Sequence, residues 1–373
     1  MGALRFRGSQ CLRTRLVLAT LTGKSLRIDD IRANDVQPGL RDYEASLLRL
    51  LEKVTNGCVV EIDETGTTLR YRPGLITGGS GIVHECCPSR SVGYYLEPLL
   101  LLGMFGKKPL SITLRGVTND GTDPGVDVFR TVTLPLMKRL GIEEGLELKV
   151  IKRGARPLGG GEVQLRVPNL RTLPPVNLVD EGMVKRIRGV SYSMKVSPQN
   201  TNRMVDGARG LLNKLLSDVY IFTDAVSGAA SGLSPGYGLT LVAETTSGCL
   251  ISAEACATTG GGSDGAGGES SEEPLLVPED IGRLASQALL EEVRRGGVVD
   301  GSHQGLLLML AALGPEELNQ VRLGPLTPHA VRTLRCVRDV LGVTFHMKAE
   351  AGSGTIFLTA IGCGVKNLAK KVT

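Results

Sequence analysis

The stretches LVLATLTGKSLRIDDI (residues 16–31) and YEASLLRLLEKV (residues 43–54) together outline the unit from which the chain is built. Two short apolar runs on either side of Gly23 and Lys24 predict two strands joined by a turn. The apolar side chains of the second stretch recur at helical spacing, which predicts an amphipathic helix. Because such a helix covers one face of a sheet, this segment predicts an α/β fold.

The same alternation of strands and helices continues along the chain. Further strands are predicted at 59–62, 68–71, 110–115, 146–152, 162–167, 344–348 and 355–361. Further helices are predicted at 92–102, 126–140, 278–296, 303–313 and 328–341, and a glycine-rich bend at 74–81. Pro135 should kink the second of these helices. We therefore predict an α/β (α+β) protein of repeated strand-helix units.

The pattern changes between residues 184 and 282. Strands are predicted there at 191–197, 219–223 and 239–244, with an amphipathic helix at 202–216. This segment is predicted to be a small inserted α/β domain, which divides the repeat domain into residues 1–183 and 283–373. Residues 258–273 consist almost entirely of Gly, Ser, Thr and acidic residues, and we expect a mobile loop because they have little apolar surface to bury.

Composition limits the classes of function. The 373 residues include 43 Lys and Arg against 38 Asp and Glu, a net charge of +5 that permits an anionic partner. With no Trp and 3% aromatic residues, a site built from base-stacking aromatic platforms is not expected, so any RNA contact would depend on phosphates. The eight cysteines include no CxxC pair and are predicted to be reduced thiols of an intracellular protein. No apolar run approaches the roughly 20 residues of a membrane span.

Two motifs contain arginines suited to phosphate. Arg32 and Arg41 flank the Pro38-Gly39 turn just before a predicted helix, where two guanidinium groups suit an anion. Arg153 precedes the three glycines of residues 159–161, whose backbone amides can approach an anion closely. A plain turn and a plain hairpin loop explain the same residues, and no helix follows the glycines to make a nucleotide-binding loop.

His329 is the candidate nucleophile. Thr327 is predicted to cap a helix whose first residue is Pro328, so His329 falls in the first turn. The positive end of the helix would keep the imidazole neutral and nucleophilic, although an incidental surface histidine fits the spacing too. The run His84-Glu85-Cys86-Cys87 suggests a metal, but adjacent cysteines do not easily share a tetrahedral ion, so no metal site is predicted.

Several runs of residues, in this order along the chain, resemble the RNA 3′-terminal phosphate cyclases. They are residues 10–14, 31–33, 38–41, 115–119, 153–154, 159–163, 197–198 and 234–236. Residues 39–46, 93–97, 185–189, 242–248 and 323–326 are most similar to the nucleolar cyclase-like branch of that family. The resemblance covers nearly the whole chain. It implies repeated α/β units like the carboxy-terminal domain of a bacterial translation initiation factor, interrupted by a small inserted α/β domain.

A working cyclase moves AMP from ATP to a histidine, and the resemblance puts His329 at that position. The family's amino-terminal Glu and glycine-rich stretch correspond here to residues 6–9, its Gln-His pair to Tyr43-Glu44 and its Asp-Gln pair to His303-Gln304. Since nucleotidyl transfer depends on positioned polar groups, these departures predict a chain without cyclase activity and without a cofactor. The alternative is an active ATP-dependent cyclase with His329 as the adenylylated nucleophile.

Members of the cyclase-like branch act in small-subunit ribosome assembly with a ribosome-assembly GTPase and precursor rRNA. The resemblance therefore implies these partners, a nuclear and nucleolar location, and a role in rRNA processing. The RNA- or phosphate-binding candidates are Arg13, Arg32, Arg41, Arg153, Arg335 and Arg338. An RNA-cleaving role has been proposed for the branch, but its Arg-Asp-x-Lys cluster corresponds here to residues 335–338, which lack the acid and also fit the solvated face of a helix.

Overall fold

The chain folds around three four-stranded sheets that share one strand topology. The computed structural model describes residues 3–257 and 276–370. The first sheet has the order β1-β2-β5-β4, with strands Leu4–Arg7, Leu26–Asp29, Leu69–Arg72 and Val59–Ile62. The second has the order β7-β8-β10-β9, with strands Gly79–Glu85, Leu110–Gly116, Gly161–Val167 and Glu147–Lys152. The third has the order β11-β16-β18-β17, with strands Asn177–Leu178, Leu318–Leu323, Ile356–Ile361 and His346–Ala349.

The three sheets repeat the same pairing directions. In each sheet the first pair of strands is parallel, and the next two pairs are antiparallel. A parallel pair needs a crossover, and helices supply it in the first two repeats. The predicted α/β architecture of repeated strand-helix units is therefore confirmed. A short two-stranded sheet pairs β3 (Thr55–Asn56) with β6 (Leu75–Ile76).

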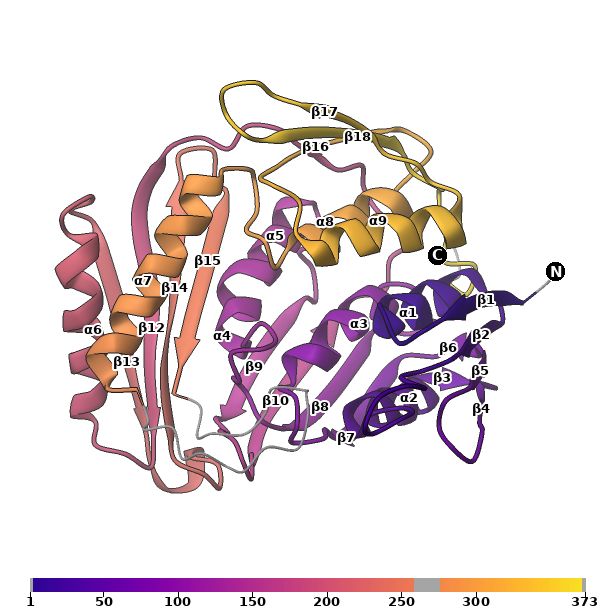
Figure 1. Ribbon diagram of the computed structural model, residues 1–373, viewed down its shortest axis with the longest axis horizontal. Helices are drawn as coiled ribbons and strands as arrows, with labels where there is room; N and C mark the ends of the chain where they lie inside the picture. The colour runs from indigo at the N-terminus through magenta and orange to yellow at the C-terminus, as the bar shows by residue number, and fades with distance from the viewer. Residues whose placement is uncertain (1–2, 258–275, 371–373) are drawn as a thin grey trace.

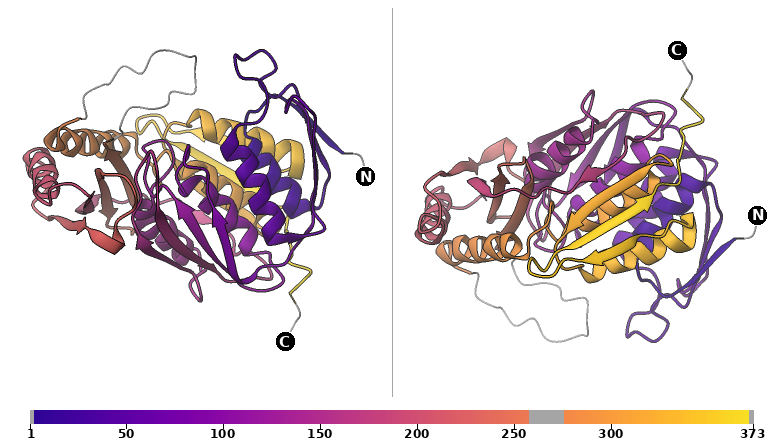
Figure 2. Two further views of the ribbon diagram at one scale, coloured as in Figure 1. Left: turned by 90° about the horizontal axis from the view of Figure 1, so that it is seen from below. Right: turned by 90° about the horizontal axis from the view of Figure 1, so that it is seen from above.

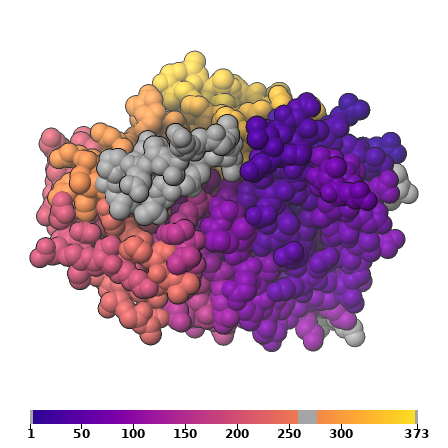
Figure 3. Space-filling view, turned by 60° about the horizontal axis from the view of Figure 1, so that its bottom comes forward, coloured from indigo at the N-terminus to yellow at the C-terminus, as the bar shows by residue number. Residues whose placement is uncertain are grey.

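Helices fill the space between the sheets (Figures 1 and 2). They are α1 (Leu12–Thr22), α2 (Asp42–Val54), α3 (Gly93–Gly103), α4 (Val126–Val128), α5 (Leu134–Arg139), α8 (Gln304–Leu313) and α9 (Pro328–Leu341). One continuous hydrophobic core runs through the three repeats, from Leu12 to Ala360. Lys24 Nζ donates to the Val340 carbonyl at 2.7 Å, so the first and last repeats lie against each other, as the indigo and yellow regions of Figure 3 also show.

A fourth unit interrupts the third repeat between β11 and α8. Its sheet has the order β13-β12-β14-β15, with strands Val219–Val226, Val184–Met194, Gly236–Thr245 and Leu250–Cys256. Helices α6 (Gln199–Leu212) and α7 (Pro278–Arg295) pack together on it, and a short 3-10 turn (Gly228–Ala230) follows β13. The unit has a hydrophobic core of its own, from Ile187 to Leu289. The boundary expected at residue 282 therefore falls inside α7, and the expected mobile loop at 258–273 lies outside the described residues.

Two local predictions were wrong. The first apolar run, expected to be a strand, belongs to helix α1, and part of the expected glycine-rich bend at 74–81 forms β6 and the start of β7. Helix α1 lies in the middle of the molecule, where Leu16 and Leu18 are fully buried. A helix that is buried on all sides has no polar face, so a short apolar run cannot be told from a buried strand by periodicity.

The helix predicted at 126–140 is irregular, as expected from Pro135. A π-helical segment (Phe129–Thr133) joins α4 to α5 just before that proline, which lacks the N–H that a regular helix would use. None of the helices in the described part of the chain is both long and apolar enough to cross a membrane.

Candidate functional site

His329 lies in the first turn of α9, as predicted. The Thr327 hydroxyl accepts a hydrogen bond from the Ala330 N–H at 3.2 Å, and Pro328 is the first helical residue. Helix α9 has a strongly amphipathic sequence, and its apolar face packs on α8 and α1. This packing holds the partly buried imidazole between helices rather than on an open surface.

The imidazole packs closely against the first turn of α8. A Cβ atom at Gly305 would lie 2.7 Å from His329 Nε2, so any other residue there would displace the imidazole. Burial lowers the pKa of His329, the nearby Glu97 raises it, and Arg13 and Arg332 lower it again. The balance is a lowered pKa, so the imidazole is neutral near pH 7, as expected. The main cause is burial, whereas the sequence pointed only to the helix end.

Arg13 is the predicted phosphate ligand whose charge affects this histidine, because it lowers the pKa of His329. It extends from α1, and its Nη2 is 2.5 Å from Glu97 Oε2 on α3, while Nη1 donates to the Tyr94 carbonyl at 3.1 Å. The side chains of Arg13 and Glu97 are only 15% and 16% exposed. Because a buried carboxylate already neutralises this guanidinium, Arg13 offers little net positive charge to a phosphate.

His303 and Gln304, the positions to which the resemblance assigns the family's Asp-Gln pair, both make hydrogen bonds inside the fold. His303 Nδ1 lies 2.8 Å from Asp300 Oδ1, and its Nε2 lies 2.9 Å from the Thr133 hydroxyl. Gln304 accepts from the Thr327 N–H at 2.9 Å and donates to the Pro325 carbonyl at 3.1 Å. Gln304 therefore holds the loop that leads into α9.

Arg32 and Arg41 do lie together near the start of α2, but both are already paired. Arg32 makes a two-pronged ion pair with Glu44, at 2.7 and 2.8 Å. Arg41 donates to Gln37 and lies 3.5 Å from Asp35. Glu44 also accepts from the Arg41 N–H at 2.9 Å. Glu44, at the position to which the resemblance assigns the family's histidine, thus pairs with the guanidinium of a predicted phosphate ligand, Arg32.

Arg153 joins the second repeat to the inserted unit. Its two terminal nitrogens lie 2.7 and 2.9 Å from the Asp127 carboxylate, and its Nε lies 2.8 Å from Asp224 on β13. The guanidinium also lies over the Tyr192 ring, 4.8 Å from its centroid. The Arg153 side chain is 3% exposed. This arrangement favours the structural interpretation of Arg153 over phosphate binding.

The remaining motifs also have structural surroundings. Arg338 lies 3.0 Å from Asp339, and both are exposed, as is Arg335, on the outer side of α9, where the sequence also allowed a solvated face. Cys336 is buried. Buried His84 lies 3.0 Å from the Ser46 hydroxyl. In residues 3–257 and 276–370, no group of three or more His, Cys, Asp or Glu side chains has the arrangement of a metal site.

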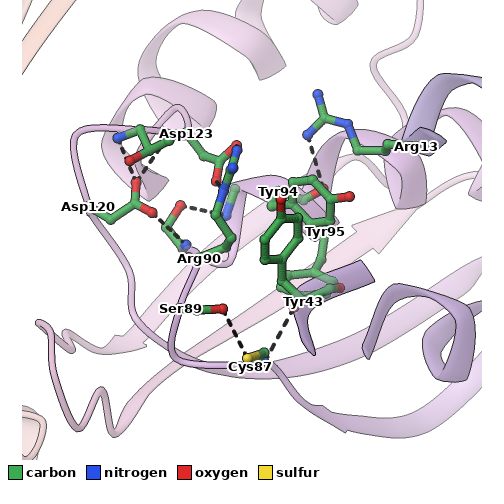
Figure 4. A network of polar contacts seen from close by, with 12 residues as sticks. Arg13, Tyr43, Cys87, Ser89, Arg90, Tyr94, Tyr95, Asp120 and Asp123 are labelled. Carbon is green, nitrogen blue, oxygen red and sulfur yellow. Dashed lines mark hydrogen bonds and ion pairs between the residues drawn. The ribbon is translucent and has the colours of Figure 1, made fainter. Parts of the chain in front are cut away.

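An arginine-carboxylate network beside this site was missed by the sequence reasoning. Arg90 makes a two-pronged ion pair with Asp123, at 2.5 and 2.7 Å, and its guanidinium lies 5.0 and 5.1 Å from the ring centroids of Tyr43 and Tyr94 (Figure 4). Asp120 accepts the N–H of Asp123 at 2.9 Å and so shapes the same loop. Arg90 and Asp123 are 33 residues apart in the sequence, and no motif spacing predicts a pair that depends on tertiary contact.

A pocket of about 360 Å³ opens next to this network, between the loop at 121–124 and the inserted unit. Its acidic lining residues are Asp123, Glu254, Glu291, Glu292 and Asp300. Arg295 is the basic residue of the lining, and it is paired with Glu292 at 2.6 Å. Burial raises the pKa of Glu254 to about 8, although the Gly125 N–H opposes this.

The structure thus combines three repeats of one strand topology, an inserted α/β unit and a histidine at the capped start of α9. The family model for RNA 3′-terminal phosphate cyclase matches residues 4–347, and the chain belongs to that family. This agrees with the resemblance carried by the sequence motifs.

Relatives of similar length match along the whole chain. "Probable RNA 3′-terminal phosphate cyclase-like protein" of Arabidopsis thaliana is 50% identical, with 99% of both chains covered. "RNA 3′-terminal phosphate cyclase-like protein" of Homo sapiens is 48% identical, with 99% of this chain and 98% of the relative covered. A Schizosaccharomyces pombe protein described as an rRNA processing protein is 44% identical over the same shares of the two chains. These relatives place the chain with the cyclase-like proteins of the family.

Proposed function

We propose that this protein is a ribosome biogenesis factor without cyclase activity, which acts in precursor-rRNA processing and small-subunit assembly together with a partner GTPase. The name of the Schizosaccharomyces pombe relative supports the link to rRNA processing. A factor of this kind works in the nucleus, at the nucleolus. Its partners would be precursor rRNA, the GTPase and other small-subunit components, and it would need no cofactor.

One observation carries the proposal: residues that replace the family's nucleotide ligands bind other residues of this chain. Glu44 neutralises Arg32, and His303 is paired with Asp300. Phosphoryl and nucleotidyl transfer depend almost entirely on positioned charges that are free to meet the phosphates. A group held in a buried ion pair is not free in this sense, because removing its partner leaves an uncompensated charge.

The alternative, an active cyclase, is favoured by His329 alone. Its imidazole is neutral near pH 7 and sits at a helix start, as a nucleophile attacking a phosphate requires. The two possibilities separate in one assay. Purified protein is incubated with ATP labelled at the α-phosphate and Mg²⁺, and covalent label is measured on denaturing gels. The H329A variant and the matched control H346A, in which an exposed histidine of β17 is replaced, are treated in parallel.

We expect no covalent adenylate on the wild-type chain and no conversion of RNA 3′-phosphate ends. Labelling that H329A abolishes and H346A retains would establish the cyclase and refute the proposal.

The ribosomal role is tested in cells by depleting the protein and measuring precursor rRNA by hybridisation. Depletion should lead to accumulation of unprocessed precursor, and both wild-type and H329A chains should restore processing. Normal precursor levels after depletion would contradict the proposed role.

A further inference from the structure

The outer face of the first sheet is lined with arginines. Strands β1, β2 and β5 alternate between apolar side chains that face the helices and arginines that face outward. We call the outward set the arginine face, which consists of Arg5, Arg7, Arg27, Arg70 and Arg72. The sheet lies at the edge of the molecule, with α1 and α2 on its inner side (Figures 1 and 2). A shallow pocket of about 280 Å³ lies on this face, and four of the five arginines line it.

The strand register brings three of these arginines into one row. Arg5 is the direct partner of Arg27 across β1 and β2, and Arg27 is the direct partner of Arg70 across β2 and β5. Neighbouring strands are about 4.8 Å apart, so three like charges stand side by side. Like charges in directly opposed positions of a sheet are destabilising. An anion bound along this row would therefore relieve the repulsion between the three arginines.

The acids on this face compensate the row incompletely. Asp29 accepts from Arg27 at 2.9 Å, whereas Glu61 lies 3.7 Å from Arg70 in a pair that is 59% and 63% exposed. Neither Arg5 nor Arg72 is in an ion pair with any residue among 3–257 and 276–370. Solvent-exposed pairs contribute little, so most of the positive charge is available to a partner.

The second sheet provides an internal comparison because it has the same topology. Three of its outward cations, Arg115, Lys149 and Arg166, each lie within 4 Å of a carboxylate on the same sheet. Arg115, for example, is paired with both Glu85 and Glu162. The repeat architecture thus accommodates a balanced outer face, and the excess of arginine on the first sheet is not a consequence of the fold.

We propose that the arginine face binds the phosphodiester backbone of RNA. Guanidinium groups match phosphate with paired hydrogen bonds, and a row of them follows a repeating anion better than it fits a single small one. A protein partner would need a buried apolar anchor, but the large apolar residues lining the pocket, Leu26 and Tyr71, are themselves 2% and 1% exposed. With no exposed aromatic ring in that lining, binding should be insensitive to base sequence.

This inference rests on the proposed function in naming RNA as the polyanion, and it differs from the phosphate ligands predicted around His329. It is tested with a labelled 20-nucleotide single-stranded RNA of mixed sequence, with binding measured over a range of salt concentrations. The variant R5Q/R70Q/R72Q removes three charges from the arginine face. The matched control R115Q/K149Q/R166Q removes three charges from the balanced face of the second sheet.

Each phosphate contact with single-stranded nucleic acid contributes about 0.7 to the slope of log K against log salt, so losing three should lower the slope by about 2 and affinity at 0.15 M salt by about 50-fold. The control should keep the wild-type slope. E61Q, which removes an acid from the arginine face, should instead tighten binding a few-fold. A gain in RNA affinity in E61Q could not be explained by a loss of protein stability.

Equal losses in the two triple variants would mean a general charge effect and would overturn the proposal. So would polyglutamate binding that depends on the arginine face while RNA binding does not, because this would indicate an acidic protein segment as the occupant. The proposed function is judged separately by precursor rRNA in depleted cells. A wild-type requirement there, combined with unchanged RNA binding by R5Q/R70Q/R72Q, would refute this surface and leave the ribosomal role intact.

Discussion

Replacing Arg153 by methionine tests whether this predicted phosphate ligand is a structural residue. Met has a similar stem and no charge, so R153M leaves the Asp127 carboxylate, whose side chain is 0% exposed, without the two hydrogen bonds that Arg153 donates to it. Breaking a buried pair from one side costs about 3–5 kcal/mol. Arg130 remains 3.4 Å from Asp127, so we expect the lower end of this range, about 3 kcal/mol.

The assay is urea unfolding followed by far-ultraviolet circular dichroism, because the chain has no tryptophan. The double variant D127N/R153M removes the stranded charge and should recover part of the lost stability, since both partners of the pair are then neutral. As a control, R188M breaks an ion pair that is 37% and 53% exposed and should change the unfolding midpoint very little. Because Arg153 links two units with separate cores, R153M should unfold the inserted unit at lower urea.

A loss of less than 1 kcal/mol in R153M, on the order of a surface pair, would refute the reasoning. So would a double variant no more stable than R153M. RNA binding gives an independent criterion: if Arg153 is structural, R153M should bind RNA like the wild type under conditions where both are folded. A large loss of RNA binding in folded R153M would restore its assignment as a phosphate ligand.

Two further predictions concern titrating groups. Burial favours neutral forms, but mutual attraction outweighs it, so the pKa of Asp300 is lowered from 3.8 and that of His303 is raised from 6.5. The contribution of this ion pair to stability is complete between pH 3.8 and 6.5. It is lost as pH rises through the raised pKa of His303. It is also lost as pH falls below 3.8 toward the lowered pKa of Asp300. Thermal unfolding of H303Q should therefore differ most from wild type between pH 4 and 6.5, and a constant difference up to pH 9 would contradict the pair. A hydrogen bond from Cys336 lowers the pKa of Cys11 to about 7, so Cys11 should react with iodoacetamide with a midpoint near pH 7, and C336A should move this midpoint upward.

Local sequence signals predicted the parts of this structure that depend on near neighbours. Helix α2 was found from its amphipathic spacing, and the start of α9 from a threonine cap followed by proline. Helix α1 was missed because it has no polar face, which is a consequence of its place among other helices. Strand β16 was also missed, although its pairing with β11 and β18 completes the third sheet.

The site shows the same contrast between features set by near neighbours and features set by tertiary contacts. The position of His329 follows from its own helix, whereas partners of Arg13 and Arg153 come from distant segments. Arg153 finds Asp224 across 71 residues, and Arg13 finds Glu97 across 84. An arginine near a glycine or a helix start has the same sequence pattern whether it binds a phosphate or is paired with a carboxylate. Only the tertiary contact decides between these states, so phosphate-ligand predictions from spacing alone are the least secure.

The ion pairs of these residues also contribute to the stability of the fold. An active site keeps charged groups unpaired for its substrate, and such groups reduce stability. In this chain Glu44 opposite Arg32, and His303 opposite Asp300, give these charges partners. The variant E44H should therefore leave Arg32 without its carboxylate and destabilise the start of α2, because Glu44 also accepts from the Arg41 N–H.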